Sequence, residues 1–308
     1  MARSNTSIYA ALVSNIVIAV AKFIAGGISR SSAMISEAIH SLVDCINELL
    51  LLLGIHKSNK ENDKSHPFGY GRELYFWSFI VSLLIFGLGA GVSFYQGIIH
   101  LLRPAMADHL KLNFMVLGIA FISEGSSFVI AWKAFRKIRG DQPFWQAIRT
   151  SKDPTTFMVL LEDGAAVTGI MIVFICLYFG EKYQNPYLDG IASLCIGFLL
   201  SFISAVLMRE SHSLLMGEGV SQESERGIIG LVKQQKTIQN VHRIFSLYEA
   251  PEEVLIVLIV SFKDGLDIDE ITNAIDEIKK LIRAKYPKIN YILIQPEDES
   301  RKSDGFDN

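Results

Sequence analysis

Several signatures of enzymes and of nucleic-acid-binding proteins are absent from this sequence of 308 residues. It has only three cysteines, Cys45, Cys176 and Cys195, all within apolar runs and without a CxxC spacing, so we expect neither a disulfide framework nor a structural zinc knuckle. It contains no P-loop, HExxH motif or nucleophile elbow. A net charge of -3 provides no basic field for nucleic acid. We therefore expect no enzyme, no prosthetic group and no nucleic-acid partner.

Apolar residues, in contrast, are abundant and grouped. Half of the chain is hydrophobic, and the mean hydropathy is +0.32. A membrane-spanning helix needs about 20 apolar residues. Segments of this length are expected near 8–28, 33–56, 74–101, 111–135, 155–180 and 187–208. The first is too long for a signal-peptide core, so we interpret it as a span and not as a removed leader. In the third, Gly87 and Gly91 have a spacing that favours close helix packing, with dimerisation as the less favoured alternative.

The basic residues of the connecting loops predict the orientation. Ten of them lie in the second-to-third and fourth-to-fifth connections, against four in the three connections on the other side. Positively charged loops stay in the cytoplasm, and an even number of spans puts both termini on the same side. We predict a multi-pass integral membrane protein with cytoplasmic N- and C-termini. A compact chain without a leader favours the inner membrane of a bacterium, with an organelle membrane as the alternative.

The composition becomes that of a soluble domain from about Arg209. An amphipathic helix is expected at 222–235, strands at 241–249 and 254–262, a helix at 269–285 and a last strand at 290–295. The order α-β-β-α-β suggests a small sheet with helices on one face. The predicted fold is a membrane all-α domain of six helices (1–208), followed by a small cytoplasmic α+β domain (209–297) and a polar tail (298–308).

The second expected span carries ionisable residues that are costly in a bilayer. These include Glu37, His40 and Asp44, and intramembrane charges of this kind usually have a function. His40 and Asp44 are four residues apart, so both side chains lie on one face of the helix and can hold a divalent metal ion. A polar contact between packed helices is the alternative interpretation.

Three features together resemble the cation diffusion facilitator family. They are SEAIHSLVD on the second span, HPFGYGRE in the following loop, and the six spans with a C-terminal α-β-β-α-β domain. The resemblance covers roughly residues 8–297. It implies a homodimeric exporter of divalent metal, usually zinc, driven by counter-flow of protons, with a ferredoxin-like cytoplasmic domain.

The family pattern implies a transport site with two ligands from the second span and two from the fifth. His40 and Asp44 match the first pair, and Asp163 matches one member of the second. Val159 stands where the family has His. Glu162 is the candidate replacement, since a long carboxylate can reach inward from its position; pairing with another helix is the alternative. This departure resembles the sub-branch nearest the ninth animal zinc transporter.

Three further residues are candidates by resemblance. Glu124 of the fourth span is expected to be a proton relay or a partner of the ligands, against a hydrogen bond between helices. Asp63 and His66 match two ligands of a family loop site, but Tyr70 replaces the third, so a loop anchor is the alternative to a weak metal site. The C-terminal domain has too few histidines for a zinc cluster.

We therefore predict a proton-coupled antiporter that exports a divalent cation by alternating access, with zinc as the substrate. The mixed nitrogen and oxygen ligands leave manganese, iron, cobalt and nickel open. A membrane protein that binds or senses metal without moving it is the other alternative.

Overall fold

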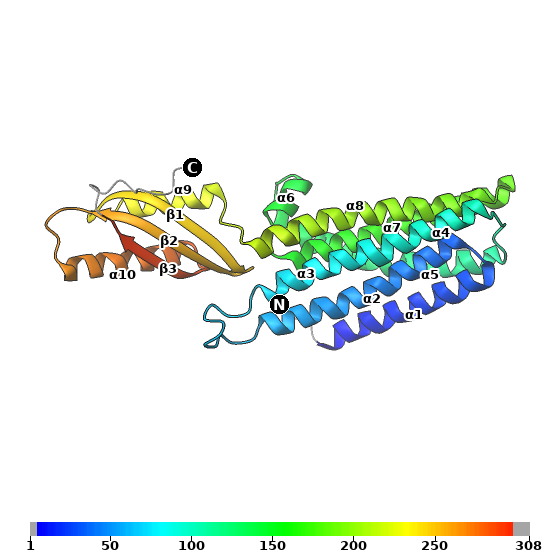
Figure 1. Ribbon diagram of the computed structural model, residues 1–308, viewed down its shortest axis with the longest axis horizontal. Helices are drawn as coiled ribbons and strands as arrows, with labels where there is room; N and C mark the ends of the chain where they lie inside the picture. Colours follow the sequence, from blue (N-terminus) through cyan, green and yellow to red (C-terminus); the bar gives the residue numbers. More distant parts are fainter. Residues whose placement is uncertain (1–4, 298–308) are drawn as a thin grey trace. The chain divides into compact units, whose positions relative to one another are not determined.

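The computed structural model describes residues 5–297 and divides the chain into two compact units (Figure 1). The helical unit contains the described residues up to His56 together with Glu73–His212. The α/β unit contains Lys57–Arg72 together with the described residues from Ser213 onward. The predicted polar tail at 298–308 lies outside the described residues.

The helical unit is formed by long helices that run side by side (Figure 1). They are α1 (Asn5–Ser29), α2 (Ser32–Ser58), α3 (Glu73–Leu84), the π-helical turn η1 (Ile85–Ala90), α4 (Gly91–Leu102), α5 (Leu110–Arg139), the short α6 (Phe144–Thr150), α7 (Pro154–Tyr183) and α8 (Tyr187–Met216). Each expected span coincides with one of them, the third being the continuous run α3–η1–α4. Among the described residues, five helical segments have the length and hydropathy of membrane spans, and Asn15–Ser29 is a shorter apolar one.

The outer surface of these helices is apolar. Val17 of α1 is 62% exposed, Ile122 of α5 75% and Phe198 of α8 66%. Water would disfavour such large side chains around a whole bundle, whereas lipid chains solvate them. With the span lengths, this surface identifies an integral membrane protein.

Close helix packing occurs at other glycines than expected. A Cβ atom at Gly97 of α4 would lie 3.0 Å from the carbonyl oxygen of Gly190 in α8 and 2.7 Å from Leu194. Gly87 has open space around it, and Gly91 meets only its own helix. The expectation of close packing within the chain at Gly87 and Gly91 is therefore wrong among the described residues, and α4 meets α8 at Gly97 and Gly190; dimerisation through Gly87 and Gly91 stays a prediction.

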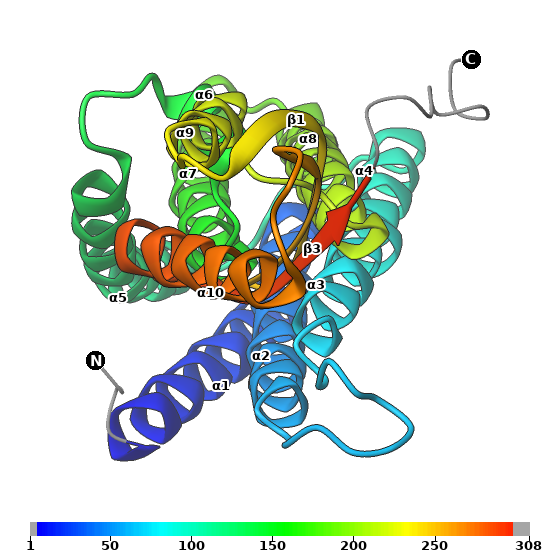
Figure 2. The same ribbon diagram turned by 90° about the vertical axis from the view of Figure 1, so that its left-hand side faces the viewer.

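The α/β unit has the expected element order. It contains α9 (Gln222–Lys233), β1 (Ile238–Ala250), β2 (Glu253–Phe262), α10 (Ile268–Lys285) and β3 (Ile289–Pro296). The sheet order is β1-β2-β3, with β1 antiparallel and β3 parallel to β2. Alternate β2 residues from Val254 to Val260 are buried beneath α9 and α10, which contact each other on one side of the strands (Figure 2). The predicted fold class is confirmed.

The loop Lys57–Arg72 packs within the α/β unit. Arg72 Nε lies 2.9 Å from Glu249 Oε2 of β1, and Phe68 meets the ring of Tyr291 of β3 edge-on at 5.3 Å. The α/β unit is thus built from two separate stretches of chain, which the composition of the sequence did not indicate.

Candidate metal site in the helical unit

The residues His40 and Asp44 lie together on α2, as their spacing predicts. His40 Nδ1 is 3.5 Å from Asp44 Oδ1, and His40 is 1% exposed. Within the described part of the chain, neither ring nitrogen of His40 nor Asp44 Oδ1 has a hydrogen-bond partner. Buried polar atoms are nearly always paired in folded proteins. An imidazole and a carboxylate left unpaired side by side therefore have the chemistry of metal ligands.

The two adjacent carboxylates of α7 point toward different helices. Glu162, 8% exposed, accepts a hydrogen bond of 3.2 Å from Asn47 Nδ2 of α2. Asp163 accepts one of 2.7 Å from Ser127 Oγ of α5. This divergence follows from the 100° turn per residue of a helix. Glu162 thus faces α2, and its partner Asn47 lies one turn beyond Asp44 on that helix.

The four predicted ligands do not form a closed cluster. In the part of the chain that the structure describes, no group of three or more His, Cys, Asp or Glu side chains is close enough to hold a metal ion. Glu162 is held by its hydrogen bond to Asn47 of α2, and Asp163 by its hydrogen bond to Ser127 of α5. Metal binding at this place therefore requires Glu162 or Asp163 to exchange its hydrogen bond for the ion.

Glu124 belongs to an ion cluster beside these residues. The Lys22 ammonium of α1 is fully buried and lies 2.8 Å from Glu124 Oε1, 3.1 Å from Glu37 Oε2 and 2.8 Å from Ser41 Oγ. The cluster joins α1, α2 and α5. Glu37, one of the ionisable residues noted in the second expected span, is fully buried in it.

Sequence reasoning did not find Lys22, Asn47 and Ser127 as partners of the candidate ligands. Lys22 had a clear signal, since it is the single charge in the apolar run from Ile8 to Ile28. The sequence shows Asn47 as a polar residue one turn beyond Asp44, but it does not indicate that Asn47 bonds to Glu162. Neighbouring Glu48 accepts a hydrogen bond of 2.8 Å from Asn15 of α1, which is a polar contact between helices.

Asp63 and His66 lie in the loop of the α/β unit, where Asp63 organises the turn. Its carboxylate accepts hydrogen bonds from Tyr70 Oη at 2.8 Å and from the backbone N–H groups of Ser65 and His66, both at 2.9 Å. These bonds, that of Tyr70 foremost, hold the pKa of Asp63 well below its usual range. The ring of His66 packs on Tyr70, with centroids 4.2 Å apart. Asp63 and Tyr70 thus make their bonds within this one turn.

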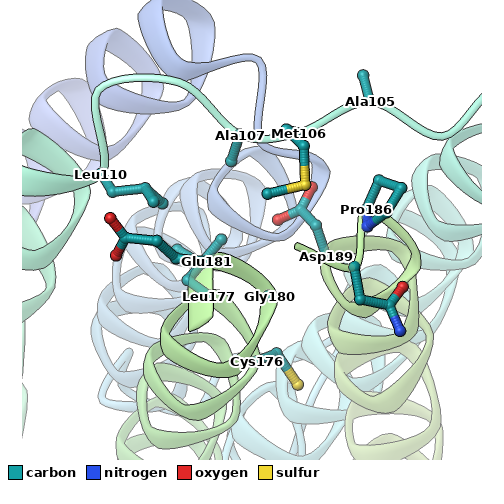
Figure 3. A pocket seen from close by; sticks show the side chains of 11 residues that line it. Ala105, Met106, Ala107, Leu110, Cys176, Leu177, Gly180, Glu181, Pro186 and Asp189 are labelled. Carbon is teal, nitrogen blue, oxygen red and sulfur yellow. The ribbon is translucent and has the colours of Figure 1, made fainter. Parts of the chain in front are cut away.

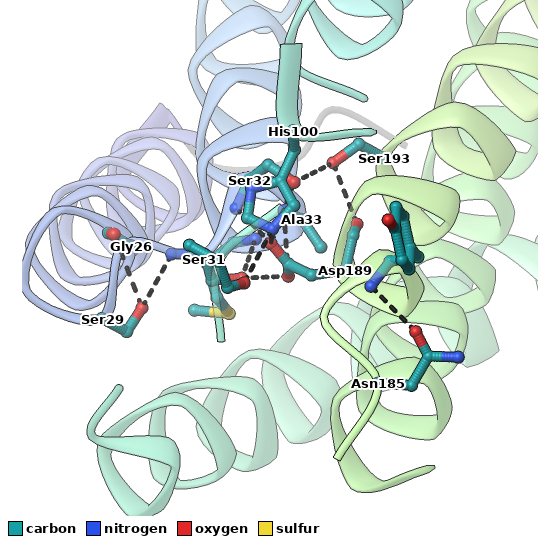
Figure 4. A network of polar contacts seen from close by, with 12 residues as sticks. Gly26, Ser29, Ser31, Ser32, Ala33, His100, Asn185, Asp189 and Ser193 are labelled. Carbon is teal, nitrogen blue, oxygen red and sulfur yellow. Dashed lines mark hydrogen bonds and ion pairs between the residues drawn. The ribbon is translucent and has the colours of Figure 1, made fainter. Parts of the chain in front are cut away.

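A second polar cluster lies where α2 and α8 begin (Figure 4). Asp189 Oδ2 accepts from Ser32 N at 2.6 Å and from Ser32 Oγ at 2.9 Å, and Oδ1 accepts from Ser31 Oγ. His100 Nε2 is 3.5 Å from Asp189 and 3.0 Å from the carbonyl of Ala105. The carboxylate thus caps α2, where the helix dipole favours negative charge. The adjacent pocket is lined mainly by apolar side chains and backbone, and has room for about one water molecule (Figure 3).

These observations define a polytopic membrane protein with a buried imidazole–carboxylate pair in its bundle and an α/β unit after the last span. The family model of the cation efflux transmembrane domain matches residues 8–216. The chain therefore belongs to the cation efflux, or cation diffusion facilitator, family, whose members are membrane transporters and not enzymes.

Curated relatives in this family include proteins named for zinc and for manganese. One relative is the proton-coupled zinc antiporter SLC30A9, mitochondrial, of Xenopus laevis, to which the chain is 32% identical over 269 residues. The matched region covers 84% of this chain and 48% of the relative. It is 35% identical to the human protein of that name, over 72% of this chain and 40% of the relative. The manganese efflux system protein MneP of Bacillus subtilis is 23% identical over 92% of both chains. The chain thus spans about half the length, or less, of the zinc antiporters.

Proposed function

We propose that this protein exports a divalent metal cation across the membrane in exchange for protons, with zinc as the substrate. The observation that carries the proposal is the His40–Asp44 pair of α2, whose ring nitrogens and Oδ1 are buried without hydrogen bonds in the described part of a cation efflux chain. A nitrogen donor with carboxylates suits zinc. The names of the relatives keep manganese as the alternative cation.

Glu162 and Asp163 are the proposed ligands from α7. Glu162 is buried on the side of α2, where it replaces the ligand that Val159 cannot supply. Asp163 can join by releasing Ser127. Alternating access then has a simple local form, because binding would draw α7 toward α2 while release restores the bonds to Asn47 and Ser127.

Proton coupling follows from the chemistry of these ligands. Imidazole must be neutral and carboxylates ionised to bind a metal, so protons and metal compete for the same atoms. Histidine is the side chain best suited to exchange protons near neutral pH. Glu124 is the proposed proton relay, since its Oε2 is buried without a hydrogen-bond partner among the described residues.

The proposed topology has both termini on the cytoplasmic side, where the basic loops would lie. The proposed membrane is the inner membrane of a bacterium. The mitochondrial location in the names of the vertebrate relatives makes an organelle membrane the alternative. A homodimer is proposed from the family resemblance, and Asp63 with His66 is proposed as a loop anchor, with transient metal capture as the alternative.

A specific observation supports a second candidate function. Because Asn47 and Ser127 hold the α7 carboxylates apart, the same residues could bind metal weakly without moving it. The protein would then be a metal-binding or sensing membrane protein.

The test is metal-driven proton flux in liposomes that contain the purified protein. Wild type is compared with Asp44→Ala, Glu162→Ala and the control Glu48→Ala, which removes a carboxylate of α2 outside the proposed site. Loss of zinc-driven flux in the first two variants alone supports the antiporter with Glu162 as a ligand. Loss in Asp44→Ala alone makes Glu162 a packing residue. Absence of flux in the wild type with zinc, manganese, iron, cobalt and nickel overturns the exporter and favours sensing.

A further inference from the structure

The ion cluster around Lys22 has the form of an oxygen cage around a cation. Three side-chain oxygens lie 2.8–3.1 Å from one buried nitrogen, Lys22 Nζ. Glu37 and Ser41, four residues apart on α2, contribute two of them, and Glu124 of α5 contributes the third. The family motif that defines the metal site does not include Lys22.

The cage has more oxygen atoms than the ammonium uses. Glu37 Oε1 and Glu124 Oε2 are buried and, among the described residues, have no hydrogen-bond partner. Glu37 Oε1 also lies so close to Gly169 of α7 that a side chain at that position would collide with it. Four helices therefore meet at the cage, where two carboxylate oxygens and a hydroxyl contact a single positive charge and two further carboxylate oxygens are left without a partner among the described residues.

The charge of the cage also calls for a cation. Two carboxylates in the interior of a membrane protein are costly unless they are neutralised, and one ammonium supplies one positive charge. Carboxylate and hydroxyl oxygens are the ligands preferred by hard divalent cations such as Mn²⁺, Mg²⁺ and Ca²⁺. Without the lysine, the cage has the donor set for such an ion.

The cage lies next to the proposed transport site. Glu37 is three residues before His40, which is about 4.5 Å along the helix axis, and Ser41 follows His40 directly. Two divalent ions bound at these neighbouring places would repel each other in a medium of low dielectric constant. A covalently attached cation at the second place prevents that arrangement, since it cannot leave with the substrate.

We propose that Lys22 is a tethered cation that occupies a second, oxygen-lined divalent-cation site formed by Glu37, Glu124 and Ser41, and so limits the bundle to one mobile metal ion. Lys22 is thereby a specificity-determining residue of the transporter. The inference rests on the proposed function only for the first ion, at His40 and Asp44.

The experiment counts Mn²⁺ ions bound to the purified full-length protein in detergent, by equilibrium dialysis and elemental analysis. Lys22→Gln removes the ammonium and should bind about one Mn²⁺ per chain more than the wild type. Lys22→Arg keeps a positive charge and should bind the wild-type number. The matched control Lys22→Gln/Glu37→Gln breaks the cage and should lose the additional ion. A purely structural ion pair would not change the number of bound ions.

Variants that also carry Asp44→Ala separate failure of this proposal from failure of the proposed transport site. Lys22→Gln/Asp44→Ala should still bind the additional Mn²⁺ that Asp44→Ala alone does not bind. A folded Lys22→Gln protein that binds no additional ion overturns the proposal. If this variant is too unstable in metal-free buffer for ions to be counted, Mn²⁺ must raise its melting temperature more than that of the wild type and of the double variant with Glu37→Gln. Equal shifts overturn the proposal as well.

Discussion

Two of the polar clusters that the helical unit buries differ in how completely their atoms are paired. Around Asp189, the carboxylate accepts from backbone and hydroxyl donors of Ser31 and Ser32, and Ser193 bonds to Ser32 in turn (Figure 4). Around His40 and Asp44, both ring nitrogens and a carboxylate oxygen are buried without hydrogen bonds within the described residues. The first cluster has the pairing of a structural contact, and the second has the donor atoms of a binding site.

The position of each cluster along its helix explains the difference. Asp189 faces the first turn of α2, where backbone N–H groups have no partner inside the helix and can bind a carboxylate. His40 lies two turns further on, where the backbone groups are used by the helix itself. Side chains must pair the polar atoms there, and the α7 carboxylates bond to Asn47 and Ser127 instead. Loss of the negative charge should therefore impair function at Asp44 and stability at Asp189.

The largest expected effect is that of Asp44→Asn. The substitution keeps the size of the side chain but removes the negative charge that binds the metal. We expect zinc transport to fall by about 100-fold or more, since even residues behind the ligands contribute about 10–100-fold. The melting temperature should change little, because no hydrogen bond to Oδ1 is lost. Transport above a tenth of the wild-type rate would contradict the role of Asp44 as a ligand.

Asp189→Asn should show the reverse pattern. The amide cannot accept at both ends, so donors of Ser31 and Ser32 lose their partner, at a cost of about 2–3 kcal/mol. Thermal unfolding in detergent should detect the loss, while zinc affinity measured in the folded protein stays within about threefold of the wild type. Ser193→Ala, which removes a single hydroxyl of the cluster, serves as the milder control. Weaker zinc binding with unchanged stability would mean that the two clusters are coupled.

Asn47→Ala tests the connection between α2 and the α7 carboxylate. Asn47 donates to Glu162 and so orients it beside the proposed site. Its loss should weaken zinc binding by about tenfold, as expected for a residue that positions a ligand. Zinc titration of Asn47→Ala is compared with that of Asn15→Ala, which removes the equivalent amide partner of Glu48. An equal effect of both variants would show that Glu162 has no special position.

The smallest effect is expected in the exposed loop, where Tyr70→Phe removes a hydrogen bond to Asp63. The pKa of Asp63 lies below its usual value, so its bonds order the loop above that usual value and are lost as the pH falls through the lowered pKa. In Tyr70→Phe the pKa should rise, and loop opening should begin at higher pH. Pepsin cleavage of residues 57–72 between about pH 2 and 4 reports the opening. Identical pH profiles would contradict this role of Tyr70.

Periodicity and composition were sufficient to predict the helices and strands of the fold. Continuous apolar runs predicted the long helices, and the β-branched run from Val254 to Val260 predicted the central strand, because burial on this scale leaves a direct pattern in sequence. The pairing of Glu162 with Asn47 could not be predicted, since it depends on the rotation of α7 relative to α2. Lys22 illustrates a different limit. Its charge was visible in the first span, but its partners Glu37 and Glu124 lie on two other helices.

The loop Lys57–Arg72 has a consequence for the order in which the chain folds. Arg72 bonds to Glu249, which follows it by 177 residues, and Phe68 packs on Tyr291, which is made still later. During synthesis the loop therefore waits without its partners while the four later spans are produced. A chain truncated before β1 lacks every strand on which this loop rests, and an isolated C-terminal fragment lacks the loop. Separate expression of the two halves would thus divide one folding unit, although the cut would lie between spans and sheet.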